Sequence, residues 1–113
     1  MWIFTKIGFF SAVQDKDNSN QIMVRARCLE DIENLVEYMV GFGTDEPEIH
    51  DSIGTDYKYR IFIPRKRWAL LLVKLGNEID YTNFKNHVHG DHDRDYAYLQ
   101  CWNAMFQFQE SKL

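Results

Sequence analysis

The clearest hydrophobic pattern lies between residues 56 and 75, where a two-residue alternation changes into a helical repeat. Up to Ile63 every second residue is apolar, which predicts a strand with one apolar and one largely basic face. Pro64 then ends the strand and can begin a helix, because its fixed φ and missing N–H suit a first helical turn. The apolar stripe of that helix is formed by Trp68, Leu71, Leu72, Leu75 and Ile79.

The N-terminal part of the chain alternates in the same way and predicts further strands. We expect a strand over Trp2–Thr5, a bend or bulge over residues 6–8, and a continuation of the strand over residues 9–14. The polar run at residues 15–20 predicts a hairpin loop, and residues 21–27 its antiparallel partner.

Helical periodicity appears in three later segments. Leu29–Val40 carries an apolar stripe with acidic residues in its first turn, and glycines after Val40 predict its end. A short strand is expected over residues 48–53, and a helix over residues 65–77. A helical turn from Thr82 should precede a last helix over residues 93–109.

In order, these elements read β-β-α-β-β-α-α. They predict one α+β domain over residues 1–113, with a mostly antiparallel sheet and helices packed on one face. A ferredoxin-like arrangement and two ββα units side by side both fit this order, and the sequence does not choose between them.

Composition narrows the setting of this domain. The 113 residues are 45% hydrophobic and 15% aromatic, with a net charge of −4. An acidic chain argues against a general nucleic-acid or membrane-surface binder, but leaves room for a local basic patch. Cys28 and Cys101 lack metal or redox spacing and are expected to be reduced, buried thiols of a cytoplasmic protein. We expect no signal peptide at the N-terminus, and the sequence holds no apolar run of membrane-spanning length.

The most conspicuous motif is the run HVHGDH at residues 87–92. It matches the HxHxDH string of metallo-β-lactamase-fold hydrolases, but that fold needs further histidine ligands downstream, and none follows here. A generic zinc-type site, of a metal-binding protein or a small hydrolase, could use His87, His89 and His92 with Asp91 or Asp93. The structural alternative, which we favour, is a solvated loop in which one of the aspartates caps the last helix.

A quieter feature is a set of cations on the predicted strands. Arg25 and Arg27 share one strand face, and Lys58 and Arg60 share another. If both strands belong to one sheet, all four cations lie on the face away from the helices. Aromatic residues expected there are Trp2, Phe10 and Phe62. Small α+β modules bind single-stranded nucleic acid on such faces, although any uncovered sheet face must be polar.

The last helix has an unusually wide apolar face, containing Tyr96, Leu99, Trp102, Met105 and Phe106. Such a face suits burial on more than one side, or contact with a protein partner or a second copy of the chain. No nucleophile elbow surrounds Ser11, and no base is placed beside Cys28, so no catalytic constellation emerges. We therefore expect a non-enzymatic binding or adaptor protein without a cofactor, acting through the basic face or the last helix.

Several segments carry a resemblance that spans most of the chain: MWIFTKIGFFSAVQ, MVRARCLEDIENL, YKYRIFIPRKRWA, IDYTNFK and RDYAYLQCW. In the pattern MWxFTxxGFxSxVQ, YxNFK and RDxxYLxxW, the sequence resembles a family of small uncharacterised bacterial proteins. The resemblance implies a single intact domain. It implies no known reaction, so it brings no catalytic residues to this chain.

Overall fold

The computed structural model describes residues 1–41, 43, 45–87 and 91–113. Its contacts divide the chain into two compact units, Met1–Ile79 and Asp80–Leu113. The single domain expected over residues 1–113 stays a prediction.

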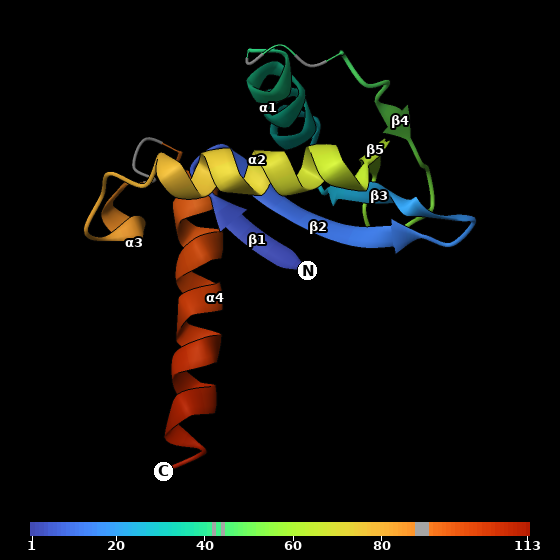
Figure 1. Ribbon diagram of the computed structural model, residues 1–113. Helices are drawn as coiled ribbons and strands as arrows, with labels where there is room; N and C mark the ends of the chain where they lie inside the picture. Colours follow the sequence, from blue (N-terminus) through green and yellow to red (C-terminus); the bar gives the residue numbers. More distant parts are fainter. Residues whose placement is uncertain (42, 44, 88–90) are drawn as a thin grey trace. The chain divides into compact units, whose positions relative to one another are not determined.

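The first unit is built around a five-stranded antiparallel sheet with the strand order β1-β2-β3-β5-β4 (Figure 1). Its strands are β1 (Trp2–Thr5), β2 (Gly8–Asp15), β3 (Asn18–Ala26), β4 (His50–Asp51) and β5 (Tyr59–Pro64). The α+β class and the antiparallel sheet are thus confirmed. The structure does not show the ferredoxin-like alternative.

The start of the chain differs from the prediction. The expected bend at residues 6–8 is a hairpin turn, so β1 and β2 run antiparallel side by side with Thr5 opposite Gly8. The break at residues 6–8 was therefore expected, but the interpretation of the two segments as one bent strand was wrong. The turn holds only Lys6 and Ile7 between the strands and lacks the Asn-Gly or Asp-Gly signal of a two-residue hairpin. Unit 1 consequently begins with three strands rather than two.

Two helices, α1 (Leu29–Val40) and α2 (Arg65–Asn77), have the bounds that their apolar stripes predict. α1 packs on β2, β3 and β5, and α2 packs on β3 and β5 (Figure 1). Both helices cover the same sheet face, because alternate residues of β3 and β5 join both helices in one core. The core contains Phe10, Ala12, Ile22, Val24, Ala26, Ile32, Leu35, Val36, Met39, Ile61, Ile63, Trp68 and Leu71.

The edge strand β4 is much shorter than expected. Only His50 and Asp51 pair with β5, instead of residues 48–53. Both residues are exposed, so little apolar burial supports a longer strand at this edge.

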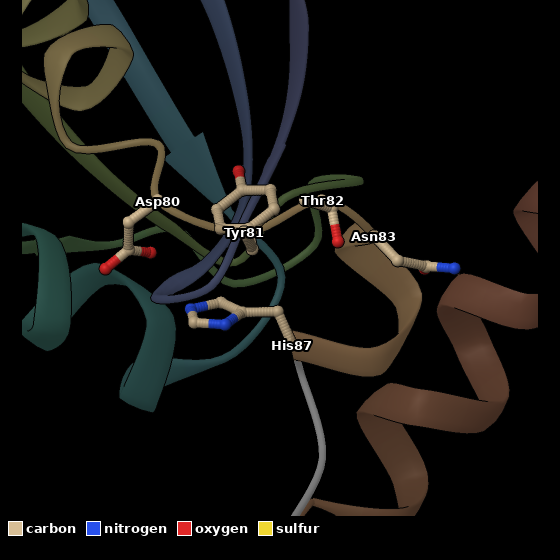
Figure 2. A pocket seen from close by; sticks show the side chains of 5 residues that line it. All are labelled: Asp80, Tyr81, Thr82, Asn83 and His87. Carbon is tan, nitrogen blue, oxygen red and sulfur yellow. The ribbon is translucent and has the colours of Figure 1, made fainter.

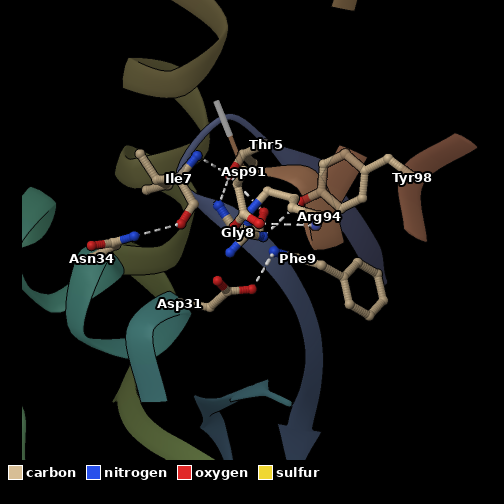
Figure 3. Close-up of polar contacts among 9 residues, drawn as sticks. All are labelled: Thr5, Ile7, Gly8, Phe9, Asp31, Asn34, Asp91, Arg94 and Tyr98. Atoms are coloured by element: carbon tan, nitrogen blue, oxygen red, sulfur yellow. Dashed lines mark hydrogen bonds and ion pairs between the residues drawn. The ribbon is translucent and has the colours of Figure 1, made fainter. Parts of the chain in front are cut away.

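The second unit contains the one-turn helix α3 (Phe84–His87) and the long helix α4 (His92–Glu110). The ring of His87 stacks on Tyr81 with a centroid distance of 4.6 Å (Figure 2). Asp91 is the N-cap of α4, because its carboxylate accepts a hydrogen bond of 3.1 Å from the Arg94 N–H (Figure 3). The same arginine donates to the Tyr98 hydroxyl at 3.2 Å. The aspartate cap is thereby confirmed.

Cys28 and Cys101 are exposed thiols, so their predicted burial was wrong. Cys28 occupies the N-cap position of α1, where the chain enters the helix from the surface. Among the described residues, no helix combines the length and the apolarity that crossing a membrane requires.

Candidate functional site

The sheet face opposite α1 and α2 carries one continuous row of side chains across all five strands. Residues that pair directly across antiparallel strands project to the same face. The register aligns Trp2 with Ser11, Ser11 with Arg25, Arg25 with Arg60, and Arg60 with His50. We call these five residues the arginine row.

Arg25 and Arg60 are therefore direct cross-strand neighbours at the centre of the sheet. Arg25 Nη2 donates a hydrogen bond of 2.7 Å to the buried Ser11 hydroxyl. Arg60 Nη2 donates to Thr55 Oγ1 at 3.0 Å and to the Tyr57 carbonyl at 3.1 Å. All these acceptors are neutral, so the two positive charges are oriented but not compensated.

Among the described residues, neither arginine forms an ion pair. The Nε atoms of Arg25 and Arg60 are also buried without a hydrogen-bond partner. Like charges directly opposite each other destabilise a sheet, and a buried unsatisfied donor costs about 1–3 kcal/mol. An anion bound over the two arginines would relieve the repulsion between their like charges.

A third cation joins the pair through Tyr57, which is 5% exposed. The guanidinium carbons of Arg25 and Arg27 lie 4.6 Å and 4.2 Å from the centre of its ring. Arg27 Nη1 also donates to the Asp56 carbonyl at 2.9 Å. Tyr57 precedes β5 in a bend, so the expected alternation from Tyr57 to Ile63 begins only at Tyr59.

The fourth predicted cation lies apart from this cluster. Lys58 is exposed, and its Nζ lies 5.5 Å from the ring of Tyr59. Tyr59 is partly buried against the helix-covered core. The structure thus brings together Arg25, Arg27 and Arg60, while Lys58 interacts with a different ring.

Aromatic rings flank the arginines at both sheet edges. Trp2 and Phe9 form an edge-to-face pair at 6.1 Å, and Phe4 lies 4.6 Å from Phe9. At the other edge, His50 packs edge-to-face on Phe62 at 5.4 Å. Of the three aromatics expected on this face, Trp2 and Phe62 lie there.

The prediction that Phe10 lies on this face was wrong. Phe10 is 1% exposed in the core, and Phe9 takes the outward position. Once the hairpin between β1 and β2 is known, the alternation of residues alone predicts that Phe4 and Phe9 project from the outer face of the sheet.

The turn between β1 and β2 is closed by Thr5 and joined to α1 by two hydrogen bonds (Figure 3). Thr5 Oγ1 donates to the Gly8 carbonyl at 2.8 Å and accepts from the Gly8 N–H at 3.1 Å. Asp31 Oδ2 accepts from the Phe9 N–H at 3.0 Å, and Asn34 Nδ2 donates to the Ile7 carbonyl at 3.1 Å. These contacts fix the strand that carries the aromatic edge of the face.

The described residues of the candidate metal site at residues 87–93 do not form a cluster of ligands. His87 lines an open pocket of about 480 Å³ together with Asp80, Tyr81, Thr82 and Asn83 (Figure 2). Among the described residues, no three His, Cys, Asp or Glu side chains could hold a metal ion together.

Of the other two candidate histidines, the structure describes only one. His92 opens α4 and is exposed, whereas His89 lies outside the described residues. Asp91 is engaged as the cap of α4, and Asp93 lies in the first turn. A metal site at residues 87–93 stays a prediction.

No model of a known protein family, no curated protein and no solved structure matches this chain.

Proposed function

We propose that the protein is a non-enzymatic binding module that recognises an acidic partner through the outer face of its sheet. The observation that carries this proposal is the direct pairing of Arg25 with Arg60, with no ion pair to either among the described residues.

The chemistry of the two side chains favours an oxyanion as the ligand. Guanidinium groups bind carboxylate and phosphate through paired hydrogen bonds, which are stronger than neutral ones. Neutral neighbours already orient both groups: Ser11 for Arg25, and Thr55 for Arg60. An anion placed over the pair would reduce the repulsion between them, so binding and relief of that repulsion are coupled.

The net charge of −4 does not oppose a local site of this kind. Screening limits the reach of exposed charges to about 10 Å at moderate ionic strength. Groups that touch the ligand therefore outweigh the acidic residues elsewhere on the surface.

Retention on phosphocellulose at low ionic strength tests the proposal. An acidic chain should flow through at neutral pH unless a local cationic surface holds it. We expect the native chain to be retained and the double variant Arg25→Gln with Arg60→Gln to elute at clearly lower salt.

The matched control is Lys16→Gln with Lys66→Gln, which removes the same two charges from exposed positions outside the arginine row. This control should elute with the native chain. Equal elution of the two double variants would contradict the proposal. Circular dichroism checks folding, and the single variant Arg25→Gln replaces the double variant if the latter is unfolded.

A second candidate function is protein binding, or homodimer formation, through α4. Its exposed apolar side chains are Tyr96, Leu99, Trp102, Met105, Phe106 and Phe108. Residues 96–109 hold no charged side chain that would discourage self-pairing. Sedimentation at rising protein concentration tests the homodimer, and a constant monomer mass would exclude it.

We also propose that the chain is related to the family of small uncharacterised bacterial proteins that its sequence resembles. This proposal rests on the segments given above, and it adds no activity to the binding function.

A further inference from the structure

We infer that the acidic partner is a single-stranded nucleic acid, with bases stacked on Trp2 and Phe4 and phosphates held by Arg25 and Arg60. This inference rests on the proposed function and names its ligand. It is carried by the side chains that share the sheet face with the arginine pair.

The aromatic group is built as a platform rather than as a core. Trp2 is 70% exposed and Phe4 is 38% exposed, while Phe9 on β2 is half-buried. Phe9 contacts both exposed rings and so supports them from the sheet. Exposed aromatic rings held by a rigid strand offer stacking surfaces to any base, because every base has a π-face.

The register places base and phosphate sites on one line. Trp2 and Arg25 belong to the same cross-strand row and are separated by β2 alone. Neighbouring strands are about 4.8 Å apart, so the two backbones lie roughly 10 Å apart. A nucleotide chain running across the strands could place a base over Trp2 and a phosphate over the guanidinium groups.

The far side of the arginine pair also has an aromatic contact. His50 stands next to Arg60 in the row, and its ring packs edge-to-face on Phe62. The two arginines therefore lie between an aromatic ring at each end of the row, Trp2 at one end and His50 at the other. Such an alternation suits a polymer that alternates planar bases with anionic phosphates.

Other acidic partners fit less of this surface. An acidic peptide would use Arg25 and Arg60 but has no general need for a platform of exposed aromatic rings. A nucleic-acid duplex presents phosphates but keeps its bases stacked internally, out of reach of Trp2. A single strand uses both kinds of group on the face.

Fluorescence anisotropy with a labelled single-stranded oligonucleotide of about twelve nucleotides tests the inference. We expect Trp2→Ala to weaken binding about five-fold to a hundred-fold, and Trp2→Phe to retain most of it. Leu70→Ala is the matched control, because it removes a comparably exposed apolar side chain (65% against 70%) from α2. It should bind like the native chain.

The cations have their own signature in the same assay. Arg25→Gln should lower the slope of log affinity against log salt by about 0.7 for each lost phosphate contact. An unchanged slope would overturn the phosphate role, and native affinity in Trp2→Ala would overturn the stacking role. Labelled polyglutamate and the duplex form of the same oligonucleotide are the competing probes.

These probes separate the two proposals. Tighter binding of polyglutamate, lost in Arg25→Gln, would support an acidic partner but overturn nucleic acid as its identity. Tighter binding of the duplex would likewise overturn the single-strand inference. Binding of none of the three probes would overturn both.

Discussion

The side chain of Asp31 fills the space in which Gly8 would carry a Cβ atom. An ideal Cβ at residue 8 would lie 2.6 Å from Asp31 Cγ and 2.8 Å from Asp31 Cβ. The same carboxylate accepts the hydrogen bond from the Phe9 N–H. The first turn of α1 is thus seated on the turn between β1 and β2, and a side chain at residue 8 would push the two apart.

Gly8→Ala should therefore destabilise the protein by about 1–3 kcal/mol, the usual effect of overpacking a filled site. Chemical denaturation measures the change in the free energy of unfolding. Gly76→Ala is the control, since nothing lies within 4 Å of its added methyl group in α2. Alanine is the better helix former, so the control should be neutral or stabilise by up to about 1 kcal/mol.

Asp31→Ala should also destabilise, by about 1–3 kcal/mol, because it leaves the Phe9 N–H without its carboxylate acceptor. Asp31 is 4% exposed, so water cannot readily replace the lost group. Glu30→Ala removes a neighbouring acid in the same first turn from an exposed position. If the two variants unfold at the same denaturant concentration, the hydrogen bond has no special role.

The helices of this chain could be predicted from sequence because local signals agree. Leu29–Val40 has an acidic first turn, an apolar stripe and a glycine end, and Arg65–Asn77 follows a proline. The hairpin between β1 and β2 could not, because its turn is specified by tertiary contacts. Thr5, Asp31 and Asn34 stabilise it, and no sequence pattern links residue 7 to residue 34.

The candidate site was partly predictable for a similar reason. Alternation places Arg25 and Arg60 on outer faces of their strands, but only the register makes them direct neighbours. The alternation up to Ile63 predicts an uninterrupted strand, but a bend at Tyr57 delays the start of β5 to Tyr59. The outward position of Phe9 depends on the hairpin between β1 and β2. Because that turn was not predicted, Phe10 was assigned to the outer face in place of Phe9.

The core should respond strongly to truncation on the inner side of α1. Leu35 is fully buried between the helix and the sheet, so Leu35→Ala should cost about 2–5 kcal/mol by creating a cavity. Leu70→Ala, at a position that is 65% exposed, should change stability by no more than about 0.5 kcal/mol. Comparable losses in both variants would contradict the assignment of this core.

An interaction between α1 and the end of α2 should make stability depend on pH. The Tyr38 hydroxyl donates to Glu78 Oε2 at 2.5 Å, and Lys74 Nζ lies 3.1 Å from Glu78 Oε1. The hydrogen bond from Tyr38, and then the contact with Lys74, lower the pKa of Glu78 below its ordinary 4.5. Partial burial, and then the same carboxylate, raise the pKa of Tyr38.

Because the pKa of Glu78 is lower in the folded protein than in the unfolded chain, folding stabilises the ionised carboxylate relative to its protonated form. Its contribution is present above about pH 4.5 and is lost as the pH falls through the lowered value. Tyr38→Phe removes the donor, so its deficit in urea midpoint relative to the native chain should be largest near pH 6 and shrink towards pH 3. Tyr96→Phe, at an exposed position of α4, should show no such trend. A deficit of Tyr38→Phe that stays constant over this range would mean that the hydrogen bond does not favour the carboxylate over its protonated form.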